Sequence, residues 1–205
     1  MLIDPDEVSI GQVYAWMIRI ITPRPIAWVA TQSPGGVPNL APFSYFSGVS
    51  SNPAALLFCC ANRADGTAKD TLRNLREIPQ FVVNVVPAHL GPSMLATSAE
   101  LEYEVSEFST AGLDPVASQR VVPPGVKESP IRIECEVLQI VPVGSGIGAS
   151  HVILGKILLF DVADYVLDAS GKIDPEKVDT IGRMGGRGYC HTRDRFDLLP
   201  TVNPT

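Results

Sequence analysis

The sequence predicts a mainly β protein: an antiparallel β-barrel with a few helices, in one domain over residues 1–205. Short runs of β-branched and aromatic residues recur along the chain, and turn residues separate them. The 17 glycines and 18 prolines favour frequent turns over long helices. No G-x-G-x-x-G motif opens a helix after a strand, and the β-α-β rhythm is absent, so a Rossmann domain is disfavoured.

The first predicted element is a helix over residues 5–21. Asp4 suits its cap, Pro5 its first position and Glu7 a capping box. Apolar residues then follow at helical spacing: Ile10, Val13, Tyr14, Met17 and Ile21. This stripe predicts packing against the core, and Pro23 ends the helix.

The barrel core is predicted over residues 22–166, and it begins with a hairpin. Strands are expected at 26–31 and from residue 37, on either side of the turn 33–36, and Pro42 indicates an edge strand or a bulge. Further strands are expected at 47–50, 54–61, 81–86 and 131–141, with one or two in 150–166. Short helices are expected within 67–78, 88–99 and 104–111, and residues 167–205 form a C-terminal tail.

Composition argues against several classes of protein. A net charge of −6 and a pI of about 5.0 disfavour nucleic acid as a partner. The longest apolar stretch, 54–61, is far shorter than the roughly 20 residues of a membrane helix. The start lacks a basic segment of the signal-peptide kind, so a cytoplasmic protein is expected. Four cysteines without a C-x-x-C pair and three histidines predict no metal site.

A basic, polar turn over residues 62–71 opens one of the predicted helices. Thr67 is expected at its N-cap, and a helix start offers free N–H groups to an anion. Arg63 and Lys69 add positive charge, and Thr67 and Thr71 add hydroxyl groups. These groups suit a phosphate. The alternative is that the basic residues are simply solvated.

The residues before this turn suit the rest of a flavin mononucleotide (FMN). Ser50 and Ser51 offer short polar side chains to a ribityl chain, and the corner at Pro42 frees backbone groups beside an apolar slot for a ring. The alternative for the serines is that they serve the turns in which they lie. We therefore hypothesise that this stretch binds a flavin nucleotide.

Several motifs, in order along the chain, resemble the flavin reductase-like family, the flavoredoxin type of FMN-binding split barrel. They are 23–31 (PRPIAWVAT), 38–46 (PNLAPFSYF), 49–53 (VSSNP), 65–74 (DGTAKDTLRN), 81–86 (FVVNVV), 96–99 (ATSA), 107–113 (EFSTAGL) and 128–130 (ESP). Residues 182–189 also resemble the family's tail near the active site, whereas Leu95 departs from the pattern, in which Asn is frequent.

The resemblance implies a Greek-key split barrel and a homodimer, with FMN bound non-covalently at or near the dimer interface. It implies electron transfer between NADH or NADPH and flavin, or from flavin to an acceptor such as a monooxygenase or an electron-transfer protein. It places Phe43 and Ser44 at the ring, Ser50 and Ser51 at the ribityl chain or phosphate, Arg63, Lys69 and Thr71 at the phosphate, and His151 near the flavin. A purely structural His151 is the alternative. No catalytic side chain is expected, and the alternative function is a non-catalytic split barrel that binds flavin or haem.

Overall fold

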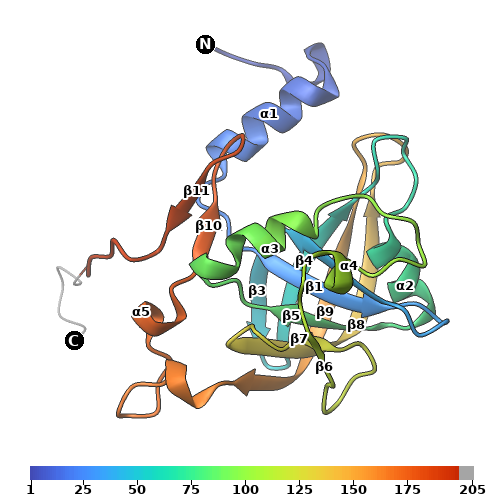
Figure 1. Cartoon of the computed structure of the whole chain (residues 1–205). Coiled ribbons are helices and arrows are strands. Elements are labelled where there is room, and N and C mark those ends of the chain that lie inside the picture. The colour runs from blue at the N-terminus through green and yellow to red at the C-terminus, as the bar shows by residue number, and fades with distance from the viewer. Residues whose placement is uncertain (199–205) are drawn as a thin grey trace.

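A computed structural model describes residues 1–198, and its centre is one sheet of seven antiparallel strands curled into a barrel (Figure 1). The strands are β1 (Ala27–Gln32), β2 (Pro38–Phe43), β3 (Phe46–Ser51), β4 (Ala54–Ala61), β5 (Gln80–Asn84), β8 (Ile131–Val143) and β9 (Ser150–Val162). Their order is β2-β1-β5-β8-β9-β4-β3, so β2 and β3 are the two edges. They follow one another in the chain but do not pair, and the barrel is open along this seam.

The hairpin predicted at the start of the barrel is confirmed. Ala27 lies opposite Phe43 and Gln32 opposite Pro38 in the β1–β2 register. Pro42 lies in an edge strand, where the missing N–H costs no ladder hydrogen bond. The strand predicted at 54–61 coincides with β4.

Alternating side chains on the strands build two hydrophobic layers. The interior layer fills the barrel, and the rings of Phe43 and Phe81 lie 5.1 and 5.4 Å from the ring of Phe58. The outer layer includes Trp28 and Leu40 and is covered by α3 (Gly91–Ala96) and α4 (Glu107–Thr110). Strand β1 is therefore buried on both faces, which explains its nearly continuous apolar sequence.

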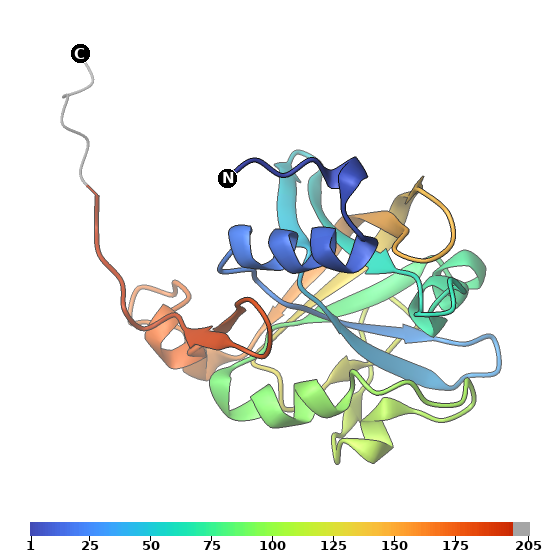
Figure 2. The same ribbon diagram turned by 90° about the horizontal axis from the view of Figure 1, so that it is seen from above.

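The remaining elements are short. Helix α2 (Asp70–Glu77) packs Leu72 and Leu75 onto the interior layer. Five short elements lie in the connections between the larger ones. They are the strand pair β6 (Pro115–Val116) and β7 (Gly125–Val126), the single turns η2 (Ala88–Leu90) and η3 (Asp164–Val166), and the helix α5 (Pro175–Val178). In the view of Figure 2, α1 and the α3–α4 segment lie on opposite sides of the barrel.

The N-terminal helix differs from its prediction. Asp4 caps only a 3-10 turn, η1 (Pro5–Glu7), and α1 (Ile10–Ile20) begins after Ser9, which forms a capping box with Gln12. None of the residues of α1 is buried, so the prediction that its apolar stripe packs against the core is wrong. The physical reason is placement: α1 projects from the barrel together with the hairpin of β10 (Ile181–Arg183) and β11 (Tyr189–His191) (Figure 1).

Arg24 joins this projecting part to the barrel. Its guanidinium donates to the carbonyl oxygens of Ile18 and Ile21 at the end of α1, at 2.7 and 2.6 Å. It also donates to the carbonyl oxygen of Met184, at 3.1 Å, and to the hydroxyl of Ser44, at 3.2 Å. One buried side chain thus fixes the helix, the tail hairpin and the seam relative to one another.

The division of the chain into a helix at 5–21, a core at 22–166 and a tail at 167–205 stays a prediction, and residues 199–205 lie outside the described part. Within residues 1–198, no helix is both long enough and apolar enough to span a bilayer.

Candidate functional site

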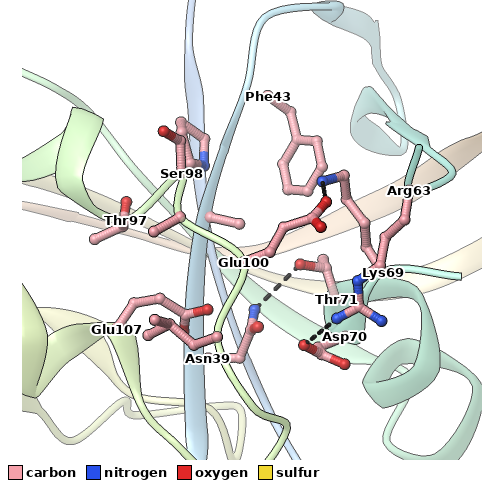
Figure 3. A pocket seen from close by; sticks show the side chains of 14 residues that line it. Asn39, Phe43, Arg63, Lys69, Asp70, Thr71, Thr97, Ser98, Glu100 and Glu107 are labelled. Atoms are coloured by element: carbon pink, nitrogen blue, oxygen red, sulfur yellow. Dashed lines mark hydrogen bonds and ion pairs between the residues drawn. The ribbon is translucent and has the colours of Figure 1, made fainter. Parts of the chain in front are cut away.

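Three segments enclose a pocket beside β2 (Figure 3). They are β2 itself, the turn 62–69 with the start of α2, and the segment 97–101 that follows α3; Glu107 of α4 adds one further side chain to the lining. The pocket measures about 470 Å³ with its open side included. The third segment is anchored by Thr97, whose hydroxyl accepts a hydrogen bond from the indole N–H of buried Trp28, at 2.8 Å.

The turn 62–69 is held in place by the β8–β9 connection. Gly66 has φ +84°, and a Cβ atom there would lie 3.2 Å from the backbone of Gly146. The side chain of Asn62 donates to the carbonyl oxygen of the same Gly146, at 3.0 Å. Both the backbone conformation and the close approach require glycine at position 66, and together they fix the loop that carries Arg63.

The start of α2 is not capped as the sequence predicted. Thr67 is not the N-cap, because its hydroxyl donates to Asp65, at 2.6 Å, in a turn that precedes the helix. The N-cap is Lys69, and in residues 1–198 it makes no side-chain hydrogen bond to the first turn. The helix therefore begins at the pocket wall, through Lys69, Asp70 and Thr71, without a side chain occupying its N-terminal N–H groups.

Each cation of the pocket is paired with a carboxylate. Arg63 contacts Asp70 at 2.7 Å, and Asp70 also contacts Arg73 at 3.2 Å. The ammonium group of Lys69 lies 3.5 Å from the carboxylate of Glu100, which reaches in from the segment 97–101. Figure 3 shows Arg63 and Lys69 on one side of the pocket and Thr97 and Ser98 on the other, with Glu100 between them.

A buried polar network supports the floor of the pocket. The hydroxyl of Thr71, 1% exposed, accepts a hydrogen bond from the amide of Asn39, at 3.1 Å. Asn39 and Asn74 also donate to the hydroxyl of Thr31, at 3.3 and 3.1 Å, and Tyr103 donates to Asn74, at 2.8 Å. Because the Thr71 hydroxyl accepts from Asn39, its O–H can donate to a second partner, and Thr71 lines the pocket.

The free edge of β2 is closed by Glu107. Its carboxylate, 6% exposed, accepts the backbone N–H of Leu40 at 2.9 Å. In the antiparallel pair, residues 38, 40 and 42 direct their backbone groups away from β1, and two of them are prolines. This edge therefore keeps outward carbonyl acceptors but no unpaired N–H. Burial raises the pKa of Glu107, although the Leu40 N–H favours its ionised form.

A second hollow, of about 630 Å³ with its open side included, adjoins the pocket and shares Pro42, Phe43 and Ser98 with it. Its walls include Ser44, which accepts from Arg24, and the tail residue Tyr189. Of the two residues predicted at a ring, Phe43 forms the wall common to both spaces and Ser44 lies in the second.

Ser50 and Ser51 lie away from the pocket of their own chain. Both are exposed at the β3–β4 turn, where Ser51 pairs with Ala54 at the start of β4. Arg63 follows the other end of β4, and a strand of this length spans roughly 25 Å at about 3.3 Å per residue. One chain thus brings together Phe43, Arg63, Lys69 and Thr71, and leaves the two serines apart from them.

His151 also lies outside the pocket lining. It pairs with Cys60 across β4 and β9, and its Nδ1 is buried without a hydrogen-bond partner in the described chain. Burial lowers the pKa of His151, and nearby Arg76 lowers it further, so the imidazole is neutral at pH 7. Burial raises the pKa of Cys60 to about 12, which makes it an unreactive thiol.

The sequence did not point to several residues of the pocket lining, among them Asn39, Glu100 and Glu107. Asn39 and Glu107 stand inside motifs that we used only for the resemblance. An acidic residue at the first position of a helix is ordinarily explained by the helix dipole, which hid the role of Glu107. Glu100 lies in an acidic stretch that is typical of an exposed surface, and no sequence pattern there indicates a binding site.

Two features define the class of this protein. One is an antiparallel barrel that is open along one seam, and the other is a cationic pocket at a helix start, beside an apolar wall. Residues 18–173 match the flavin reductase like domain, and the chain belongs to this family. The family binds flavin, and the pocket's donors suit a phosphate, while its Pro42–Phe43 wall suits a ring.

Relatives agree with this assignment. A protein of Aquifex aeolicus is 41% identical over 183 residues, which are 89% of this chain and 91% of that one. The crystal structure of nitrilotriacetate monooxygenase component B from Bacillus cereus is 33% identical, covers 97% of this chain and 98% of its own, and has a TM-score of 0.91. A Shewanella frigidimarina protein with a split barrel domain is 21% identical, covers 98% and 100%, and has a TM-score of 0.82. The predicted split barrel is confirmed.

Proposed function

We propose that this protein is an FMN-binding oxidoreductase of the flavin reductase type. It passes electrons between a reduced nicotinamide and flavin, or from flavin to an acceptor. The observation that carries the proposal is the convergence of Arg63, Lys69 and Thr71 on the start of α2, beside an apolar wall that ends at Phe43.

The phosphate of FMN is assigned to the end of the pocket at α2. Lys69 and Arg63 supply positive charge, and the O–H of Thr71 donates a hydrogen bond. The first turn of α2 adds N–H groups that no side chain caps in residues 1–198. Asp70 holds Arg63 in place rather than binding the ligand, since it already contacts two arginines.

The ring is assigned to the wall of Pro42 and Phe43 and to the hollow that adjoins it. Glu107 satisfies the outward N–H of Leu40, and the outward carbonyl groups of residues 40 and 42 can accept from a ring N–H. When bound, FMN supplies two-electron redox chemistry, so the chain needs no acid, base or nucleophile of its own. Its residues bind the flavin, orient it and exclude water from it.

The electron donor is proposed to be NADH or NADPH, and the acceptor a separate protein. The Bacillus cereus relative is component B of a monooxygenase, which supports a role as the reductase partner of such an enzyme. A non-catalytic flavin-binding barrel is the alternative, and reduction of the bound flavin distinguishes the two.

We also propose a homodimer, supported by the exposed apolar side chains of α1. Ile20 is 71% exposed, and Tyr14 and Met17 are exposed on the same helix. Ser50, Ser51 and His151 could contribute to a flavin only in such an assembly or after rearrangement, since they do not line the pocket of their own chain. Sedimentation analysis should show a dimer that Ile20→Glu weakens. A wild-type monomer would contradict this proposal.

The experiment that tests the function uses the purified chain with added FMN. We expect saturable quenching of FMN fluorescence at micromolar protein, and bleaching of the visible flavin band when NADH or NADPH is mixed in a stopped-flow instrument. Absence of quenching would contradict flavin binding. Quenching without bleaching by either nicotinamide would support the non-catalytic barrel instead.

A further inference from the structure

The pocket already contains an anion from its own chain. The carboxylate of Glu100 lies 3.5 Å from the ammonium group of Lys69. Figure 3 shows its side chain extending across the pocket, between Phe43 and the start of α2. Under the proposed function, on which this inference rests, Lys69 is a ligand of the phosphate, so Glu100 and the phosphate compete for one cation.

Glu100 differs from the other acid at this helix start. Asp70 is held by two arginines, at 2.7 and 3.2 Å, and its side chain is only 12% exposed. The side chain of Glu100 is 55% exposed and makes one, longer ion pair in the described part of the chain. An exposed pair of this kind contributes little stability, because water and salt screen it. Glu100 can therefore leave Lys69 at small cost, whereas Asp70 cannot leave Arg63.

The charge balance of the pocket explains why Glu100 would disfavour a phosphate. Arg63 and Lys69 face three carboxylates, those of Asp70, Glu100 and the buried Glu107. A phosphate that enters brings nearly two negative charges, which are repelled by a carboxylate that stays near Lys69. The neutral hydroxyl end of riboflavin meets no such repulsion.

We propose that Glu100 is a specificity-determining residue of the flavin site. It holds Lys69 in the absence of a phosphate, moves aside when FMN binds, and weakens the affinity for phosphorylated flavin without changing the affinity for riboflavin.

The test compares Glu100→Gln with the wild type, using FMN and riboflavin as separate ligands in fluorescence titrations at low salt. We expect Glu100→Gln to bind FMN about three- to tenfold more tightly, and riboflavin as the wild type does, within about twofold. The matched control is Glu102→Gln, which removes the same charge two residues further along, at an exposed position outside the pocket lining. It should leave both affinities unchanged.

The outcomes separate this inference from the proposed function. Wild-type affinity for FMN in Glu100→Gln would overturn the role of Glu100 and leave the flavin site standing. An equal gain for FMN and riboflavin would also overturn it, because the effect would then concern space rather than charge. If neither the wild type nor the variant bound either flavin, the proposed function itself would fail.

Discussion

Two arginines beside the seam, Arg24 and Arg63, use their guanidinium groups in different ways. Arg24 is 3% exposed and donates to three backbone carbonyl groups and a serine hydroxyl. Arg63 is partly exposed, donates to the carbonyl oxygen of Ala68 at 3.1 Å, pairs with Asp70 and lines the pocket. Both side chains are held by their own chain, but only that of Arg63 is also accessible to a ligand in the pocket.

The comparison teaches that charge alone does not identify a binding residue. A buried arginine bonded to carbonyl oxygens stabilises the junction of α1, the tail hairpin and the barrel, because those acceptors would otherwise lack partners. Arg63 and Lys69, each paired with a carboxylate at the pocket lining, remain accessible to an incoming anion. Substitutions at Arg24 should therefore affect stability, and substitutions at the pocket cations should affect ligand binding.

The largest expected effect is on stability, at Arg24. Arg24→Ala removes four hydrogen bonds of a buried side chain and leaves three carbonyl oxygens without this donor, so the free energy of unfolding should fall by about 3 kcal/mol. For a chain of this length the melting temperature should fall by about 6–12 °C. Thermal and urea unfolding measure both. Arg120→Ala, at an exposed arginine, is the control, and equal losses in the two variants would refute the distinction.

The next effect is on binding, at Lys69. Lys69→Ala should weaken FMN binding by about 1–3 kcal/mol, the range for a charge-assisted hydrogen bond, and leave the unfolding free energy nearly unchanged. Calorimetric titration measures the affinity. Lys127→Ala removes a surface pair with Asp114 far from the pocket lining and should have no effect on FMN. Unchanged affinity in Lys69→Ala would remove this residue from the site.

Glu107 should show a pH dependence of stability. Burial raises its pKa in the folded state above the value of about 4.3 in the unfolded chain, so the folded state binds the proton more tightly. The resulting contribution of Glu107 to the free energy of unfolding is present at low pH and is lost as the pH rises through the raised pKa. The free energy of unfolding then falls by at most about 1.4 kcal/mol per pH unit.

Glu107→Gln keeps an oxygen that accepts the Leu40 N–H but cannot ionise. Urea unfolding of the wild type and Glu107→Gln should therefore show the wild type losing stability relative to the variant as the pH rises from about 4. Glu102→Gln, at an exposed position, should follow the wild type. Parallel curves for the wild type and Glu107→Gln would show that the carboxyl group is not perturbed.

The smallest effect is expected at Ser51. Since it lies at the far end of β4 from Arg63, Ser51→Ala should change the FMN affinity by less than about 0.5 kcal/mol if one chain forms the whole site. A larger loss in the same titration would show that Ser51 reaches a flavin held by a second copy of the chain. The result shows whether FMN is bound by the pocket of one chain alone or by residues of two chains in a dimer.

The sequence predicted the local elements well and the long-range ones poorly. The hairpin, β4 and α2 follow from patterns within about ten residues, where periodicity and turn chemistry decide the structure. The stripe on α1 has the same periodicity as a buried helix, but which surface it meets depends on the whole assembly. Periodicity therefore predicted the helix correctly and its burial wrongly.

The site shows the same limit. Arg63, Lys69 and Thr71 lie within nine residues and could be grouped from the sequence. Glu100 and Glu107 reach the same pocket from a distant segment, and only the fold brings them there. The shift of the N-cap from Thr67 to Lys69 has a local cause instead: Asp65, two residues before Thr67, accepts the Thr67 hydroxyl.

The most direct test of the central claim compares the dissociation constants of FMN and riboflavin for the wild-type protein, measured by isothermal titration. A phosphate bound by Lys69, Arg63 and the start of α2 should make FMN bind at least about tenfold more tightly than riboflavin. Equal affinities, or tighter binding of riboflavin, would contradict the placement of the phosphate at this helix.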